Sequence, residues 1–96
     1  ASINDDNIPD RFAINKIYPN PFNPTTVINY QLKSNCKVSL DIYNINGQLV
    51  EQLVNTNQNL GHHEMVWDAS NFSTGVYFVK LRAGGFSETQ KLMLVK

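Results

Sequence analysis

Side chains that favour the interior alternate with polar side chains along most of this sequence, with a period of two residues. The alternation is clearest in four segments, whose same-face members are Ile28, Tyr30 and Leu32; Val38, Leu40 and Ile42; His63, Met65 and Trp67; and Tyr77, Val79 and Leu81. Because successive side chains of a strand point to opposite faces of a sheet, each segment predicts a strand with one buried face. Trp67 is expected to contribute more to the core than any other residue.

Short segments rich in Asn and Gly separate the predicted strands. Residues 44–47 end in an Asn-Gly pair that tolerates positive φ, so they predict a hairpin turn followed by a returning strand over residues 48–54. Gly84 and Gly85 predict a second tight turn, which residues 86–95 extend into a terminal hairpin. Two further segments are expected to lie outside strands, a solvated loop over residues 55–61 and a turn over residues 71–75.

Together these signals predict an all-β protein. About six or seven short strands at roughly 8 to 12 residue spacing, with no segment of helical period, are typical of an immunoglobulin-like antiparallel β-sandwich of about seven strands. A small β-barrel is the other possibility, because strand count and alternation do not determine whether a sheet closes.

Three prolines interrupt the alternation between residues 18 and 26. Pro19, Pro21 and Pro24 fix φ and remove three backbone donors, which excludes regular helix and central strand. This segment, called the knuckle below, is predicted to be rigid and either extended or turned. Phe22 is the only large apolar side chain between these prolines and is expected to anchor the knuckle to the core.

The chain divides into a linker and one domain. Residues 1–12 are polar, contain three acidic residues and show no sustained apolar period, so we expect a linker there and a single folded domain over residues 13–96. No apolar run approaches the roughly 20 residues of a transmembrane helix, so no membrane insertion is expected. The first six residues lack the features of a signal peptide, which would then lie upstream if the intact protein is exported.

Charge and polar chemistry point to no catalytic or cofactor site. Eight basic residues balance eight acidic ones, so no strong field exists to attract nucleic acid. His62 and His63 are adjacent and would point to opposite faces of a strand, which disfavours a shared metal. Cys36 is the single cysteine and is expected to be a small apolar residue at the start of a strand. No nucleophile motif, calcium loop or phosphate loop is present, so the sequence predicts no enzyme, no metal and no cofactor.

The acidic residue Asp68 and two aromatic residues also have simple structural interpretations. Asp68, after Trp67, is expected to accept hydrogen bonds from backbone donors at the end of its strand. Tyr43 and Phe78 have the opposite parity to the core positions of their strands. We expect the second sheet to cover them, and a sugar-stacking or partner-binding patch is the alternative.

A series of motifs resembles one known family. The knuckle sequence Tyr-Pro-Asn-Pro-Phe-Asn-Pro-Thr-Thr, followed by Ile28 and Tyr30, resembles the opening signature of the type IX sorting domain, also called the Por secretion tail. Further blocks follow in the order of that family: Val38-x-Leu40-x-Ile42-Tyr43-Asn44, Gly47-Gln48-x-Val50, Gly61-x-His63-x-Met65-x-Trp67-Asp68, Gly75-Val76-Tyr77-Phe78 with Leu81, and Lys91-Leu92-x-Leu94-x-Lys96. The residues expected to form its structural motif are Pro19, Asn20, Pro21, Phe22, Asn23, Pro24, Gly47 and Trp67. The chain is also similar to the immunoglobulin-like domain of flagellar hook-capping proteins.

The resemblance implies a non-catalytic sorting signal attached to an N-terminal cargo. Such a cargo crosses the inner membrane by a signal peptide, folds in the periplasm, and is exported by an outer-membrane receptor and translocon to the cell surface or the medium. A sortase-like cysteine peptidase usually removes the domain at the upstream linker. Cleavage within or before residues 1–12 fits, because an unfolded polar segment can enter a peptidase groove.

The terminal hairpin, residues 75–96, is the hypothesised recognition surface for the translocon, with Gly75, Tyr77, Lys91 and Lys96 as its residues. A competing interpretation is that the lysines only protect a sheet edge from aggregation. Two other functions remain open. One is an accessory carbohydrate- or protein-binding module of an extracellular enzyme, with Tyr43, Phe72 and Phe78 as its exposed rings, and the other is a subunit of a surface appendage.

Overall fold

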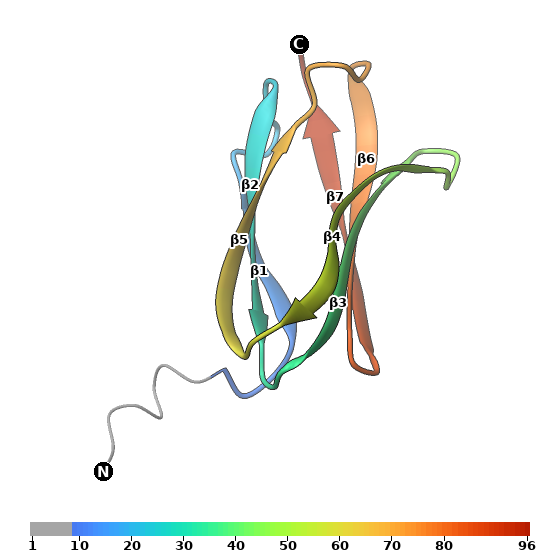
Figure 1. Cartoon of the computed structure of the whole chain (residues 1–96). Coiled ribbons are helices and arrows are strands. Elements are labelled where there is room, and N and C mark those ends of the chain that lie inside the picture. The colour runs from blue at the N-terminus through green and yellow to red at the C-terminus, as the bar shows by residue number, and fades with distance from the viewer. Residues whose placement is uncertain (1–8) are drawn as a thin grey trace.

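The computed structural model describes residues 9–96, which form two β-sheets that face each other (Figure 1). The strands are β1 (Ala13–Tyr18), β2 (Thr25–Leu32), β3 (Cys36–Asn44), β4 (Leu49–Gln58), β5 (Gly61–Asp68), β6 (Gly75–Ala83) and β7 (Phe86–Leu94). One sheet has the order β1-β2-β5 and the other the order β4-β3-β6-β7, with every pair of neighbours antiparallel. The predicted immunoglobulin-like sandwich is therefore confirmed, and the two sheets do not close into a barrel.

The core lies between the two sheets and contains most of the side chains that the alternation predicted, although His63 and Met65 are only half-buried. The completely buried apolar members are Ile28, Leu32, Val38, Leu40, Ile42, Trp67, Ala69, Val79, Leu81, Leu92 and Leu94. Trp67 is the largest of them, as expected. Cys36 begins β3 and packs half-buried against this cluster, which confirms its interpretation as a small apolar residue.

Both predicted hairpin turns are present. Gly47 has a φ of 80°, and the Asn44 side-chain oxygen accepts hydrogen bonds from the backbone N–H groups of Asn46 and Gln48 at 2.9 and 3.0 Å. Gly84 has a φ of 60°, and with Gly85 it joins Ala83 directly to its partner Phe86. These glycines occupy backbone conformations that residues with a Cβ rarely adopt.

The expected loop over residues 55–61 is wrong in most of its length. Residues 55–58 continue β4 and pair with β3, from Ser39 opposite Asn55 to Cys36 opposite Gln58. β4 is an edge strand, so its Asn and Thr side chains remain in solvent while its backbone bonds to one neighbour. Only residues 59 and 60 lie outside strands, and the Leu60 N–H donates to the Asn35 side-chain oxygen at 2.8 Å.

Alternation does not predict β1, because the strand contains a bulge. The register with β2 shifts between Ile14 and Lys16, and this shift leaves Asn15 without a partner. Ile14 and Ile17 therefore both pack toward the core at a spacing of three residues rather than two. The bulge conceals a strand from any pattern of strict period two.

The expected linker lies largely outside the described residues. Within the described part, the Gln31 amide donates to the Arg11 carbonyl at 2.7 Å, and the Phe12 ring stacks on Phe86 with centroids 5.8 Å apart. Residues 11 and 12 therefore pack on the sandwich. Across residues 9–96 the structure contains no helix of a length and apolarity that would cross a bilayer.

Polar side chains connect the two sheets along the side formed by β4 and β5. The Tyr30 hydroxyl donates to the Gln58 side-chain oxygen at 2.5 Å, and the Trp67 indole N–H donates to a Glu51 carboxylate oxygen at 3.0 Å. Burial raises the pKa of Tyr30 above its ordinary value of 10.0, because it disfavours the charged phenolate.

The raised pKa of Tyr30 predicts a specific loss of stability in alkali. Its contribution is complete below the ordinary pKa of 10.0 and is lost as the pH rises through the raised pKa of the folded state, because burial disfavours the phenolate. Tyr30→Phe is expected to be less stable than the wild type by about 1 kcal/mol at neutral pH, through loss of one hydrogen bond. Its stability should fall less steeply above pH 10, as measured by urea unfolding. Parallel pH profiles for the two proteins would contradict this prediction.

Candidate functional site

The terminal hairpin of β6 and β7 carries the residues predicted to form the recognition surface. The two strands pair from Gly75 opposite Leu94 to Ala83 opposite Phe86. β7 is the outer strand of its sheet, and its end lies at the same end of the sandwich as the β1–β2 connection (Figure 1). This arrangement brings the knuckle and the hairpin together, although they are far apart in the sequence.

The knuckle covers the edge of β7. The Phe22 N–H donates to the Met93 carbonyl, and the Val95 N–H donates to the Phe22 carbonyl, both at 2.9 Å. The Asn20 side chain donates to the Lys91 carbonyl and accepts from the Met93 N–H, both at 3.1 Å. The prolines on either side have no backbone N–H to donate. The groups of Asn20 and Phe22 therefore provide the hydrogen-bonding partners for the free backbone groups at the edge of the terminal strand.

The knuckle is also fastened to its own sheet. The Thr26 hydroxyl donates to the Pro19 carbonyl at 2.7 Å, and the Ala69 N–H donates to the Pro24 carbonyl at 2.9 Å. Pro21 and Asn23 are exposed. The knuckle thus connects β2 and the turn after β5 with β7.

Aromatic rings pack around Trp67 beneath the knuckle. Phe22 is 2% exposed, and its centroid lies 5.4 Å from that of Trp67, which confirms the predicted anchor. Tyr77 meets Trp67 edge to face at 5.5 Å, and its hydroxyl donates to the Ser73 carbonyl at 2.7 Å. Phe72 packs against both rings. These contacts join the first motif block, the Trp67 block and the hairpin in one cluster.

The four predicted recognition residues do not share one surface. Tyr77 is 7% exposed and belongs to the core. Gly75 begins β6 opposite Leu94, and Lys91 is exposed on the outer face of β7 opposite Phe78. Lys96 is exposed beyond the end of β7, where its ammonium group donates to the Ser70 carbonyl at 2.7 Å and its backbone N–H donates to the Thr74 hydroxyl at 3.2 Å.

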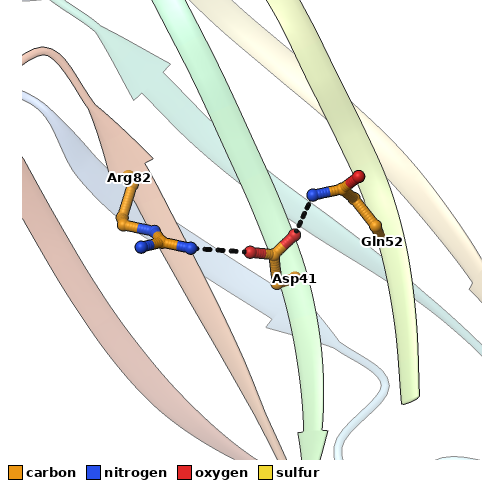
Figure 2. Close-up of polar contacts among 3 residues, drawn as sticks. All are labelled: Asp41, Gln52 and Arg82. Atoms are coloured by element: carbon orange, nitrogen blue, oxygen red, sulfur yellow. Dashed lines mark hydrogen bonds and ion pairs between the residues drawn. The ribbon is translucent and has the colours of Figure 1, made fainter. Parts of the chain in front are cut away.

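The outer face of the four-stranded sheet contains a buried carboxylate that sequence reasoning did not single out. Asp41 is 1% exposed although its strand parity places it away from the core. Its two oxygens accept hydrogen bonds from Arg82 at 3.2 Å and from Gln52 at 3.0 Å, as Figure 2 shows. An apolar-polar pattern gives no signal for this group, because its partners come from two other strands.

Tyr43 and Phe78 are neighbours on this same outer face, so the expectation that the second sheet covers them is wrong. They are cross-strand partners on β3 and β6, and both are half-buried. The β3–β4 hairpin projects from the body of the sandwich (Figure 1). It contributes Ile45 to a hollow of about 320 Å³, whose lining is completed by Tyr43, Asn44, Gly47, Phe78, Lys80 and Thr89.

The polar groups of residues 9–96 do not assemble a metal site. No three His, Cys, Asp or Glu side chains of this part of the chain gather closely enough to hold an ion. His62 is exposed, whereas the His63 ring stacks on Tyr30 with centroids 5.4 Å apart.

As expected, Asp68 accepts a hydrogen bond from a backbone donor, the Ser70 N–H at 3.0 Å. The pKa of Asp68 lies below its ordinary value, first because its carboxylate accepts a hydrogen bond from the Ser70 hydroxyl and second because it accepts one from the Ser70 N–H.

Comparisons with known proteins agree with this architecture. A family model described as the secretion system C-terminal sorting domain matches residues 16–96. No curated protein matches the chain significantly. A similar solved structure is that of PorZ, described as an essential bacterial surface component of the type-IX secretion system of Porphyromonas gingivalis, with a TM-score of 0.59 and 21% identity. The match covers 84% of this chain and 11% of the PorZ chain, and at this identity it shows the fold alone.

The edge contacts of the knuckle predict unequal effects of two matched substitutions. Asn20 and Asn23 both precede a proline, but only Asn20 bonds to β7 through its side chain within the described structure. Asn20→Ala is expected to lower the free energy of unfolding by about 1 to 2 kcal/mol and to accelerate hydrogen exchange at the Met93 N–H. Asn23→Ala should stay within about 0.5 kcal/mol of the wild type. Equal effects in urea unfolding would show that the side chain of Asn20 does not hold the edge.

The ion pair on the outer face gives a second test. Arg82→Ala is expected to lower the free energy of unfolding by about 1 to 3 kcal/mol, because the buried Asp41 would lose its charged partner. Asp41 would keep only the hydrogen bond from Gln52. Since Arg82 is half exposed, the loss should be smaller in concentrated salt. Lys37→Ala is the control, since Lys37 is exposed and forms no ion pair with another of residues 9–96. Equal stabilities of the two variants would mean that the pair contributes nothing.

Proposed function

Because the chain belongs to the family of secretion system C-terminal sorting domains, we propose that it is a folded tag that directs the export of an attached N-terminal cargo and is recognised on its terminal hairpin. Membership of this family indicates a type IX sorting signal and export to the cell surface or the extracellular space. Sorting domains of this kind are not catalytic. The finer proposal is that an outer-membrane receptor and translocon recognise the domain after the cargo has folded in the periplasm.

The observation that carries the proposal is the convergence of distant motif blocks on the terminal hairpin. Asn20 and Phe22 bond to β7, and Phe22, Trp67 and Tyr77 pack together beneath it. Most of these groups are buried or hydrogen-bonded to the backbone. They therefore maintain the shape of the hairpin and do not indicate a catalytic role. A receptor that reads such a hairpin would distinguish the folded domain from the same sequence unfolded.

The hypothesised recognition residues then have different roles. Lys91 is free to contact a receptor, since its side chain is exposed and forms no ion pair with any other described residue. Tyr77 acts indirectly, by holding β6 against the core. Gly75 and Lys96 lie where the turn after β5 meets the end of the chain, and Lys96 bonds to Ser70 there.

Removal of the tag would take place upstream of the packed residues. Arg11 and Phe12 are in contact with the sandwich, so we propose that a sortase-like cysteine peptidase cleaves the expected linker on the N-terminal side of Arg11. A peptidase needs an extended segment in its groove, and cleavage there leaves the domain folded.

The test is export of a reporter that carries a signal peptide and is fused to the N-terminus of the whole chain. In a bacterium with a functional type IX system, the fusion is expected to reach the surface or the medium, and the reporter without the domain should remain in the periplasm. Cell fractionation and surface protease accessibility measure the outcome. A fusion that remains in the periplasm of the competent strain, with the domain folded, would overturn the proposed function.

Substitutions test the hairpin more sharply than a deletion does. Removing residues 91–96 would also remove Leu92 and Leu94, which are completely buried, and the strand edge that the knuckle covers. Lys91→Ala combined with Lys96→Ala keeps the core and is expected to reduce export several-fold with little change in thermal unfolding. Unchanged export by a folded double variant would favour the interpretation that these lysines only protect the sheet edge.

A further inference from the structure

The outer face of the four-stranded sheet is positively charged, although the whole chain has no net charge. Strand parity and register place four cationic side chains on it, Lys37, Lys80, Arg82 and Lys91. Among the strand residues of this face, the one carboxylate is Asp41, which is buried and paired with Arg82. The outer face of the three-stranded sheet instead has one cation, Lys16, and two exposed carboxylates, Glu64 and Asp68.

The remaining carboxylates of the strands do not neutralise this surface. Glu51 lies on the inner side of β4, where it accepts the Trp67 indole N–H. Glu88 accepts the Ile14 N–H across the opposite side of the sandwich. Neither Lys80 nor Lys91 forms an ion pair with any of residues 9–96.

An apolar hollow lies within this basic surface. Tyr43 and Phe78 contribute its rings, and Ile45, which is 71% exposed, contributes an aliphatic side from the projecting hairpin. Lys80 lines the hollow, and Lys91 is the register partner of Phe78 on β7. Its volume of about 320 Å³ suits one apolar side chain of a partner together with adjoining backbone.

The spacing of the cations fits an extended polypeptide. Phe78 and Lys80 are two residues apart on one strand, a distance of about 6.6 Å, which is also the distance between residues i and i+2 of an extended peptide. A side chain inserted beside Phe78 would therefore place a carboxylate two residues away over Lys80. A neutral glycan would find few hydrogen-bonding partners in a hollow whose uncharged polar side chains are Asn44, Thr89 and the Tyr43 hydroxyl.

We infer that this face binds an acidic, extended protein segment that packs one apolar side chain in the hollow against Tyr43 and Phe78 and sets carboxylates over Lys80 and Lys91. The inference rests on the proposed function, because it states the chemistry of the segment by which the export machinery holds the domain. Complementary charge chiefly accelerates association, so the interaction is expected to weaken as salt increases.

The direct test uses the purified full chain and a short synthetic peptide in which Glu alternates with Thr around one central Phe. Nuclear magnetic resonance titration is expected to shift the signals of Tyr43, Phe78 and Lys80, and the same peptide with Gln in place of Glu should produce no such shifts. Lys80→Glu should weaken binding by about tenfold or more. Lys16→Glu, which reverses a cation on the other sheet, should leave binding within about twofold.

Other results would overturn the inference. Absence of shifts with the Glu peptide, or equal binding by the Glu and Gln peptides, would remove the acidic segment as the ligand. Binding of polygalacturonate but not of the peptide would indicate an anionic glycan, and concentration-dependent dimers that occupy this face would indicate a second copy of the chain. Thermal unfolding of both lysine variants confirms that they remain folded.

The reporter assay separates this inference from the proposed function. If the wild-type fusion is not exported, the proposed function fails, whereas the peptide titration still reports on the surface. If the wild-type fusion is exported and Lys80→Glu is exported equally well, the surface is not used in sorting and only the inference fails. The expected result is that Lys80→Glu reduces export about tenfold and Lys16→Glu does not.

Discussion

The contact between Phe22 and Trp67 is the interaction on which the rest of this structure depends. Trp67 fills the space between the sheets, and Phe22 reaches it from a segment that cannot form a regular strand. Once Phe22 is buried, its backbone groups and the side chain of Asn20 lie against β7. One aromatic contact therefore positions both the knuckle and the edge of the terminal hairpin.

The two faces of the four-stranded sheet have different roles. The inner face supplies Val38, Leu40 and Ile42 to the core. The outer face has a buried carboxylate paired with Arg82 and a hollow lined in part by Tyr43 and Phe78. The net charge of zero conceals that four cationic side chains share this outer face, whereas Glu64 and Asp68 lie on the other sheet. Net charge is consequently a poor guide to the partners of a small sandwich.

Alternation predicted the inner face of most strands, because burial imposes a period of two wherever a strand is regular. It missed β1, where a bulge beside Asn15 changes the period, and the end of β4, where backbone pairing alone maintains the strand at Asn55. It also misplaced Tyr43, since parity says which side chains share a face but not whether another sheet covers that face. The family motifs identified the knuckle and the hairpin, but not the hydrogen bonds of Asn20 with Lys91 and Met93, which no local pattern encodes.

The bond from the Met93 N–H to Asn20 spans 73 positions along the chain, and this separation has a consequence for synthesis. The ribosome releases the knuckle long before it releases the strand that the knuckle covers. Until then Phe22 lacks one of its neighbours, and such distant contacts also slow folding. A nascent chain stalled before β7 cannot complete the sandwich, so the finished domain signals that translation has passed that point.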